Sequence, residues 1–437
     1  MARIQDRNRF YEFLLKYVNT TFRWAFNKIE YRGLSNFPSD GAIILAPNHC
    51  NTLMDALAVL SINDDPKVFV ARADIFKKPA LAKFLRFIKI LPISRIRDGK
   101  EALLSNGGTI EESISAICDG IPFCILPEGA HRPMHSLLPL KKGIARIAMG
   151  VIDRVGDKKP VYIVPIGLEY GDYFEYRSTL LVNIAEPIKL QDFLSEHEGD
   201  SDNEIYHKIL VELEQRMKNS IVYLPDDERY SGLWELLNIG YSDHKVNSLY
   251  GRMRWMQHAA SMLIKRNPEL IERADKLAKR REQRGISLKA STSKKTLLEG
   301  VGKAIILVLL FPIVALFTTL LIPALILIGI IGPRLKDRTF INSIRQVALY
   351  IINVPVQIIL ALISLIFLPW WICPLMIAGS LAAPTVFYEY VKDWKHLIDY
   401  FRLRSDRPLK DSIGKIREQF RSRVKSDYSL TSTNDVS

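Results

Sequence analysis

Continuous apolar runs alternate with helical patterns over the first half of the chain. The runs AIILA, KVFVA, FCILP and VYIVPIGLEY are short and rich in branched and aromatic residues, which is typical of buried strands. Between them apolar residues recur at helical spacing, as Leu53, Leu57 and Leu60 do after the first run. Strands that alternate with helices predict an α/β domain, here over residues 31–190.

A helix rich in aromatic and basic residues is predicted before this domain, within residues 1–30. Its apolar side chains share one helical stripe: Phe10, Phe13, Leu14, Tyr17, Val18 and Phe22. Such a stripe is expected of a helix lying in the membrane interface, and equally of a helix packed against a protein core. No uninterrupted apolar segment follows the first basic residues, so we expect no signal peptide.

Two long uncharged runs dominate the C-terminal third. Ala304 to Gly332 and Gln346 to Tyr388 lack charges over about 29 and about 43 residues, whereas one transmembrane helix needs only about 20. We predict an integral membrane protein with a hydrophobic region at residues 296–390. The second run is long enough for a helical hairpin, while Pro312 and Pro323 allow the first to be a kinked span or a re-entrant element. Basic flanks around both runs place these flanks in the cytoplasm.

The remaining segments are charged. Residues 191–295 have a helical pattern and end in GISLKASTSKK, which is typical of a linker. Residues 391–437 predict a basic helix followed by a polar tail with the composition of a disordered segment.

The net positive charge indicates what kind of surface the protein binds. The chain has 60 basic and 47 acidic residues, a formal charge of +13, which suits a polyanionic surface such as nucleic acid or the cytoplasmic face of a membrane. The uncharged runs favour membrane lipids, and no nucleic-acid-binding motif is present. The four cysteines form no C-x-x-C pair and no zinc spacing, so we expect reduced thiols, no metal site and a domain facing the cytosol.

Candidate chemistry lies directly after three of the apolar runs. His49 and Asp55 flank a strand-to-helix turn, Arg95 follows the run KILPI, and Glu128 follows FCILP. In α/β folds, reacting groups gather beyond the carboxyl ends of strands. An imidazole suits general-base work near neutral pH, and an arginine suits phosphate binding. Cys50 beside His49 is a poor nucleophile candidate, because adjacent residues in a turn usually point apart.

Four blocks in order, NHCNTLMD, LPISR, LPEGAHR and IVPIG, resemble those of the glycerolipid acyltransferases, the PlsC-like or lysophosphatidate acyltransferase superfamily. The resemblance covers about residues 30–190. It implies an acyltransferase-type mixed sheet flanked by helices, followed by a helical linker and hydrophobic membrane helices. The PEG and LLPLKKG segments also look like the glycerol-3-phosphate acyltransferase branch.

The resemblance implies an activity: transfer of a fatty acyl group from acyl-CoA or acyl carrier protein, with no resident cofactor. Lysophosphatidic acid (1-acyl-sn-glycerol 3-phosphate) is the first expected acceptor, and its product would be phosphatidic acid. Glycerol 3-phosphate is the second, and a hydroxylated aminolipid is the third. A non-catalytic lipid-binding protein is the alternative of another class, but a binding module would not need an acid–base pair.

The resemblance also implies roles for particular residues. His49 would be the general base, and Asp55 would hold its tautomer and favour the imidazolium, as the acid does in serine hydrolases. Backbone N–H groups or Asn48 would stabilise the oxyanion. The remaining matches to acceptor-binding positions are Arg95, Glu128, Gly129, Arg132 and, more weakly, Lys141.

Two departures from the family pattern are visible. Five residues, Cys50 to Met54, separate His49 from Asp55, where the family usually has four. Ala130 and His131 intervene between the glycine and Arg132 of the third block, where the family has a single residue. Both insertions fall inside the predicted site, so they bear on its geometry.

Overall fold

The fold is that of a computed structural model, which describes residues 3–94, 106–244 and 247–424. Contacts divide the chain into two compact units. The first combines Met1–Ile221 with Gly332–Gln346, and the second combines Val222–Ile331 with Val347–Ser437. The segment Gly332–Gln346, called the connector below, therefore belongs with the N-terminal unit, although it lies inside the hydrophobic region defined from the sequence.

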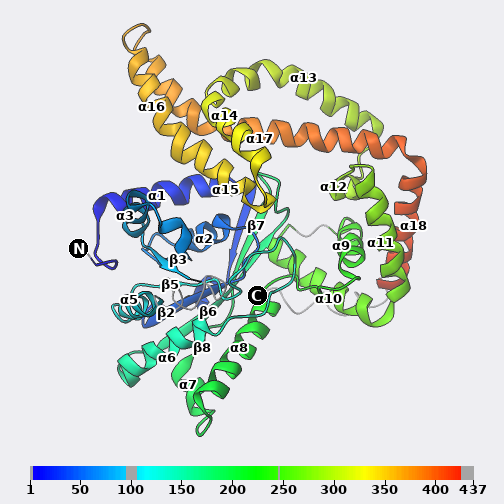
Figure 1. The fold of residues 1–437 in the computed structure, drawn as a ribbon. Coiled ribbons are helices and arrows are strands. Elements are labelled where there is room, and N and C mark those ends of the chain that lie inside the picture. Colours follow the sequence, from blue (N-terminus) through cyan, green and yellow to red (C-terminus); the bar gives the residue numbers. More distant parts are fainter. Residues whose placement is uncertain (1–2, 95–105, 245–246, 425–437) are drawn as a thin grey trace. The chain divides into compact units, whose positions relative to one another are not determined.

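The first unit is built on an eight-stranded mixed sheet with the order β1-β7-β6-β2-β5-β3-β4, in which β8 also pairs with β6 (Figure 1). The strands are β1 (Lys28–Arg32), β2 (Ala42–Pro47), β3 (Val68–Arg72), β4 (Ile90–Ile93), β5 (Phe123–Cys124), β6 (Val161–Tyr170), β7 (Thr179–Ile184) and β8 (Ile188–Lys189). Strands β6, β2, β5, β3 and β4 run parallel, and β7 and β8 are antiparallel to β6. The predicted α/β class is confirmed.

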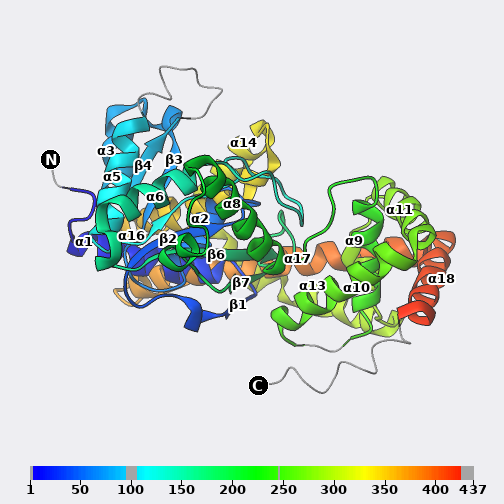
Figure 2. The same cartoon turned by 90° about the horizontal axis from the view of Figure 1, so that it is seen from below.

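Helices cover both faces of this sheet. They are α1 (Arg9–Trp24), α2 (Leu53–Leu60), α3 (Pro79–Phe87), α5 (Asn106–Cys118), α6 (Gly143–Val155), α7 (Leu190–Ser195), α8 (Asp202–Asn219) and α15 (Ile341–Gln346). Helices α5, α6 and α8 lie on one side of the sheet, and α1 and α2 lie on the other (Figures 1 and 2). Every residue of β2 is buried, as expected of a central strand covered on both faces.

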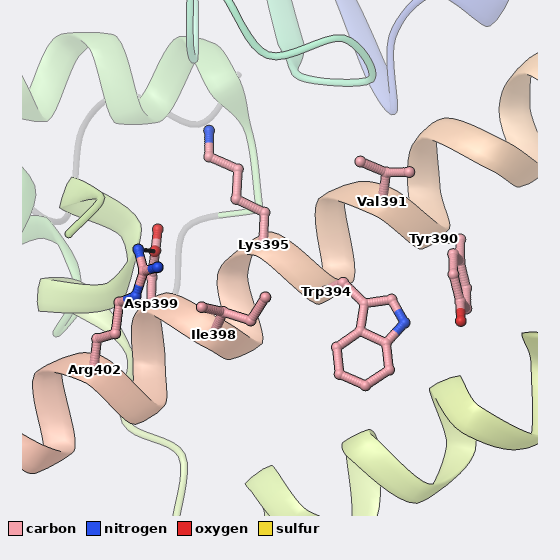
Figure 3. Close-up of a pocket in the computed structure, with 7 residues that line it drawn as sticks. All are labelled: Tyr390, Val391, Trp394, Lys395, Ile398, Asp399 and Arg402. Carbon is pink, nitrogen blue, oxygen red and sulfur yellow. Dashed lines mark ion pairs between the residues drawn. The ribbon is translucent and has the colours of Figure 1, made fainter. Parts of the chain in front are cut away.

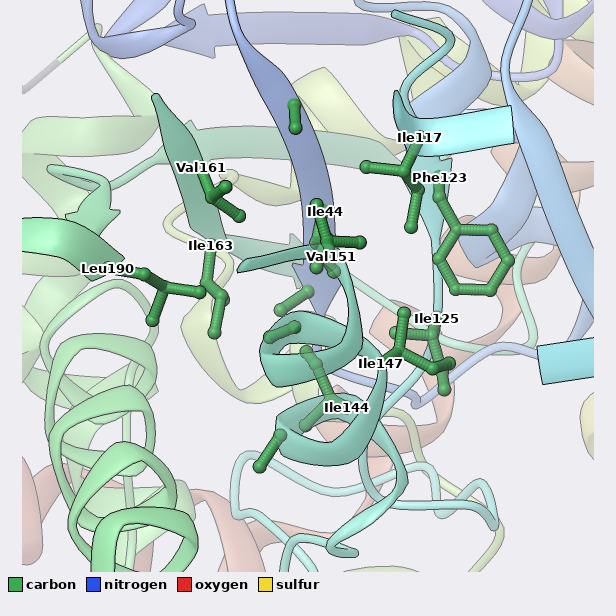
Figure 4. Close-up of a cluster of buried hydrophobic side chains, with 14 of the residues drawn as sticks. Ile44, Ile117, Phe123, Ile125, Ile144, Ile147, Val151, Val161, Ile163 and Leu190 are labelled. Carbon is green, nitrogen blue, oxygen red and sulfur yellow. The ribbon is translucent and has the colours of Figure 1, made fainter. Parts of the chain in front are cut away.

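The main core fills the space between the sheet and α6. Ile44 of β2 and Ile163 of β6 point toward Ile144, Ile147 and other apolar side chains of that helix (Figure 4). These strand residues alternate with neighbours that face the opposite side, which is the period-two pattern of a strand. The core therefore holds the carboxyl ends of β2, β5 and β6 in fixed register.

The N-terminal helix differs from its prediction in length and in orientation. It ends at Trp24, and residues 28–32 form β1 at the edge of the sheet, paired with β7. The buried face carries Tyr11, Leu15 and Phe22, whereas Phe10 and Phe13 of the predicted stripe are exposed. The helix thus packs on the core by one face and presents a second aromatic face outward.

The second unit is helical. The helices outside its long uncharged runs are α9 (Tyr230–Tyr241), α10 (Leu249–Arg266), α11 (Pro268–Gln283), α12 (Leu288–Thr292) and α18 (Arg407–Val424). Its apolar helices are α13 (Leu297–Thr319), α14 (Ile322–Ile331), the π-helical turn η7 (Val347–Ile352), α16 (Asn353–Ser364) and α17 (Ile372–Ser405). The predicted linker is partly wrong, because its middle forms α12 and buries Ala290 and Ser291. The polar tail lies outside the described residues.

Three helices are long and apolar enough to cross a membrane: Leu297–Thr319, Arg338–Ser364 and Ile372–Ser405. The second run forms the predicted hairpin of α16 and α17. The first run is interrupted after α13, where the Leu320 carbonyl accepts hydrogen bonds from Asn353 Nδ2 (3.1 Å) and Gln357 Nε2 (2.8 Å). Buried amides thus satisfy a backbone carbonyl that the break would otherwise leave unpaired in apolar surroundings.

Candidate active site

His49 and Asp55 meet across the turn that follows β2. The Nδ1 atom of His49 lies 2.8 Å from Oδ2 of Asp55. Asp55 is fully buried in the first turn of α2, while the His49 side chain keeps 14% exposure. Because Nδ1 faces the carboxylate, Nε2 is the nitrogen that can exchange a proton with a bound molecule. The structure brings the predicted pair together.

Asp55 is held by donors on both oxygens. Its Oδ2 also accepts from the backbone N–H groups of Cys50 (2.8 Å) and Asn51 (2.7 Å). Its Oδ1 accepts from the Tyr170 hydroxyl at 2.9 Å. Burial raises the pKa of Tyr170 well above its ordinary value, with a further contribution from the charge of Asp55, so the phenol remains a donor. These donors fix the position of the Asp55 carboxyl group.

Tyr170 was missed from the sequence. It is the last residue of β6 and fully buried, so from the sequence it resembles any apolar residue of a central strand. It lies 115 positions from Asp55, and no local spacing connects the two. The only available signal was a hydroxyl at the carboxyl end of a strand that neighbours β2.

Thr52 accounts for the extra residue of the first block. It has φ 52° and ψ −123°, a combination that glycine adopts easily and a β-branched residue adopts only under strain. The N–H of Met54 donates to the Asn51 carbonyl (3.0 Å) and so closes a turn that contains Thr52. This tight turn absorbs one residue before α2 begins at Leu53, so that Asp55 still reaches His49.

Glu128 joins the turn after β2 to the loop after β5. Its Oε1 accepts from the His49 N–H (2.7 Å), and its Oε2 accepts from the Leu138 N–H (2.7 Å). Burial raises the pKa of Glu128 to about 7, against these two hydrogen bonds, which lower it. Both Glu128 oxygens therefore hold backbone N–H groups, one of them that of His49.

The loop after β5 also holds His49 through its backbone. The N–H of Arg132 donates to the His49 carbonyl (3.2 Å), and Arg132 Nη2 donates to Ser136 Oγ (2.7 Å). Gly129 has φ +67°, a left-handed conformation that favours glycine. Lys141 is exposed, and its stem lies beside the Gly129 backbone. Gly129, Arg132 and Lys141 therefore share one loop region next to His49.

His131, one of the two residues that stand where the family has a single one, lies against His49. Its ring centroid is 5.2 Å from that of His49 and 5.3 Å from that of Phe340 in the connector. Its Nε2 is 2.7 Å from Oδ2 of Asp337, also in the connector. The insertion thus places a second imidazole within contact distance of the first.

The predicted oxyanion role of Asn48 does not match its position. Its side chain is buried, its Nδ2 donates to the Leu168 carbonyl (3.2 Å), and its Oδ1 accepts from the Leu168 N–H (2.6 Å). The amide therefore ties the turn to β6, because both of its polar ends bind one strand residue. Arg95 lies outside the described residues, so its predicted role remains a prediction.

Cys50 is unsuited to nucleophilic work. Its thiol is buried, and burial, followed by the charges of Asp55 and Glu128, raises its pKa well above the ordinary value. Only the thiolate is a good nucleophile. Among the described residues, no group of three or more His, Cys, Asp or Glu side chains could hold a metal ion.

A shallow hollow elsewhere lies along a single helix, α17. Its lining consists of Tyr390, Val391, Trp394, Lys395, Ile398, Asp399 and Arg402 (Figure 3). None of the residues predicted for acyl transfer belongs to it. The chemistry-bearing side chains gather instead at the carboxyl ends of β2, β5 and β6.

Comparisons with known proteins agree with this arrangement. A family model described as Acyltransferase matches residues 28–169. Glycerol-3-phosphate O-acyltransferase 2 of Saccharomyces cerevisiae is 32% identical over 102 residues, covering 23% of this chain and 14% of that protein. The chloroplastic 1-acyl-sn-glycerol-3-phosphate acyltransferase BAT2 of Brassica napus is 25% identical over 163 residues, covering 37% of this chain and 43% of that protein.

The chain therefore matches less than half the length of each of these relatives. Among solved structures, the 1-acyl-sn-glycerophosphate acyltransferase PlsC of Thermotoga maritima is 21% identical with a TM-score of 0.34, covering 49% of this chain and 81% of that one. The matched segment of the family model begins at β1 and ends within β6, and so contains His49, Asp55 and Glu128. Residues 28–169 are therefore similar to the acyltransferase family and, within that segment, to acyltransferases of glycerol 3-phosphate and of 1-acyl-sn-glycerol 3-phosphate.

Proposed function

We propose that the protein is a membrane-bound O-acyltransferase. It moves a fatty acyl group from acyl-CoA or acyl carrier protein to the free hydroxyl of 1-acyl-sn-glycerol 3-phosphate, which yields phosphatidic acid. The observation that carries this proposal is the 2.8 Å contact between His49 Nδ1 and Asp55. It orients a partly exposed imidazole whose Nε2 can take the proton of an acceptor hydroxyl.

The reaction needs no covalent acyl-enzyme. The acceptor oxygen attacks the thioester carbonyl carbon while His49 Nε2 takes the hydroxyl proton, and Asp55 stabilises the imidazolium. Collapse of the tetrahedral intermediate breaks the carbon–sulfur bond, and the thiolate leaves with the proton that His49 returns. The ester bond forms as the thioester bond breaks, so no further reactant is required.

The oxyanion donors belong to the loop after β5. The N–H groups of residues 48–51 all donate to acceptors inside the protein. Within the part of the chain that the structure describes, the N–H groups of Ala130 and His131 have no such acceptor. They precede Arg132, whose N–H donates to the His49 carbonyl, and they are the donors we propose for the developing negative charge.

A phosphorylated acceptor fits the positive charge of the site. Arg132 lies in the loop that contacts the base, and Arg95 and Lys141 are proposed to supply further charge to the phosphate. The Brassica relative is named for 1-acyl-sn-glycerol 3-phosphate. The yeast relatives, 32% and 30% identical, are named for glycerol 3-phosphate, which is therefore the second candidate acceptor.

Membrane attachment suits lipid substrates. The three long apolar helices would anchor the chain, and the exposed Phe10 and Phe13 of α1 would insert into the interface. Basic residues on both sides of the apolar runs support a catalytic domain that faces the cytoplasm. The acyl chain and the product would then stay in the lipid phase near the site.

The test is acyl transfer by the detergent-purified full chain. Labelled acyl-CoA and acyl carrier protein are each offered with 1-acyl-sn-glycerol 3-phosphate, glycerol 3-phosphate or a hydroxylated aminolipid. We expect transfer to the first acceptor by the wild type and a loss of about a thousandfold or more in His49→Ala. His258→Ala, at an exposed histidine of α10, is the control. Near-normal turnover by His49→Ala would refute the mechanism, and no transfer from either donor would refute the function.

A further inference from the structure

The connector Gly332–Gln346 is part of the first unit, although apolar helices precede and follow it in the chain. Four of its side chains are buried there: Thr339, Asn342, Ser343 and Gln346. Asn342 Nδ2 donates to the Tyr173 carbonyl (2.9 Å), and the Tyr176 hydroxyl donates to Gln346 Oε1 (2.8 Å). A surface linker would not bury polar groups against the loop after β6, so this segment is a built element of the catalytic unit.

Ser343 contacts the most strained residue of the active-site turn. Its Oγ lies 2.7 Å from Oγ1 of Thr52, and both side chains are buried, with 5% and 6% exposure. Thr52 Oγ1 also lies 3.5 Å from the carbonyl oxygen of Thr339. A β-branched residue at positive φ persists only when its surroundings hold it. The connector supplies this hold through a hydrogen bond out of reach of solvent.

The position of Thr52 decides the position of Asp55. The N–H of Asp55 donates to the Thr52 carbonyl (3.3 Å), and Thr52 immediately precedes α2. Relaxation of Thr52 toward an unstrained conformation would rotate the start of this helix and move the carboxylate away from His49. Asp337 and Phe340 contact His131 on the other side of the base, so the connector touches both neighbours of the catalytic pair.

We propose that Ser343 of the connector is a positioning residue, which holds Thr52 in its strained conformation and thereby keeps Asp55 against His49. The segment between two membrane-anchoring helices thus completes the active-site turn. The effect of Ser343 on kcat rests on the function proposed above, whereas its effect on the position of Thr52 and Asp55 does not. Each is measured separately.

The kinetic arm compares four full-length proteins: wild type, Ser343→Ala, Thr52→Gly and the double variant. In Ser343→Ala we expect kcat to fall about tenfold, as for one lost buried hydrogen bond, with an unchanged KM for the acyl thioester. Glycine adopts the Thr52 conformation without strain. In the Thr52→Gly background the Ser343→Ala change should therefore alter kcat by less than about twofold.

The structural arm follows amide hydrogen exchange of the peptide that contains Cys50 and Asn51, the two N–H donors to Asp55. In Ser343→Ala these amides should exchange about tenfold faster or more, and Thr52→Gly in the same chain should restore their protection. Ser113→Ala is the matched control, because Ser113 is also buried and its Oγ donates to the Thr109 carbonyl (2.7 Å) within α5.

The outcomes separate the two proposals. Equal losses of kcat in both backgrounds, or exchange in Ser343→Ala no faster than in Ser113→Ala, would overturn the role of Ser343. Wild-type protein without any transfer would overturn the proposed function alone, and the exchange result would still decide the position of the turn. Faster exchange that Thr52→Gly reverses, together with the kcat pattern, would establish the coupling.

Discussion

At the scale of single residues, the site depends on buried polar groups that form hydrogen bonds with one another. Asp55 accepts from His49, Cys50, Asn51 and Tyr170, and removal of one buried donor leaves an acceptor without its partner. Each of these hydrogen bonds also restricts where the carboxylate can lie. Their loss should therefore be visible in kcat before it is visible in folding.

Tyr170→Phe removes one such donor without changing the shape of the side chain. We expect kcat to fall about tenfold with little change in KM, because the hydroxyl orients Asp55 and does not contact substrate. Steady-state kinetics of Tyr170→Phe beside Tyr206→Phe, a change in α8, measure this. An altered KM with a normal kcat would argue against an orienting role.

Glu128 predicts a pH dependence of stability. Its folded-state pKa of about 7 lies above the ordinary value of 4.5, so its contribution to stability is complete below about pH 4.5 and is lost as the pH rises through about 7. The unfolding free energy of the wild type relative to Glu128→Gln should therefore decrease between about pH 5 and pH 8. Thermal unfolding of both proteins in detergent measures the difference, and an increase over that interval would contradict the assignment.

At the scale of elements, the helices of the second unit illustrate how charge is used in packing. Arg281 of α11 lies in a buried pair with Glu235 of α9, with Nη2 to Oε2 at 2.9 Å. The same helix α11 carries an exposed pair, Lys276 with Glu272 at 2.7 Å. One face of α11 is buried, and the other carries the exposed charges. Helix α11 thus contributes one buried ion pair, through Arg281, and one exposed ion pair, between Lys276 and Glu272.

Arg281→Met should destabilise the second unit strongly. Removal of the cation leaves the Glu235 carboxylate buried without its partner, at a cost of roughly 3–5 kcal/mol. Lys276→Met in the exposed pair should cost less than about 1 kcal/mol. Denaturant or thermal unfolding of the two variants tests this contrast, and equal effects would show that Arg281 contributes little beyond a surface pair.

At the scale of the whole molecule, segments of the first unit alternate along the chain with the long apolar helices. The sheet and its loops come first, α13 and α14 follow later, and the connector then returns to the first unit before α16 and α17. A chain of this order cannot lose its apolar helices without also losing part of the unit that carries the site. The proposed membrane anchor and the proposed active site are therefore parts of one interleaved chain.

Membrane extraction tests the anchoring. The chain should remain with membranes after high salt and alkaline carbonate, and detergent should release it, because burial of apolar helices does not depend on ionic attraction. Immunoblots of the soluble and membrane fractions give the answer. Release by salt alone would show that the charge of +13, and not the apolar helices, holds the chain on the membrane.

The sequence alone determined the features that depend on local pattern. Buried strands, the turn that joins His49 to Asp55 and the long apolar runs all follow from residues near one another in the chain, and the structure contains each of them. His49 and Glu128 could be predicted as site residues because each directly follows a buried strand in the sequence. The helix predicted within residues 1–30 is shorter than expected, because residues 28–32 pair with β7 as the strand β1, which was not predicted.

Tertiary structure alone decided which distant residues meet. Tyr170 lies 115 positions from Asp55, and Ser343 lies 291 positions from Thr52, and no spacing or period along a chain records such contacts. Asn48 and Glu128 have the right residue types for substrate binding, yet the structure uses their polar atoms to hold backbone. A side chain's chemistry can be read from the sequence, but its partner is set by how strands and loops pack against one another.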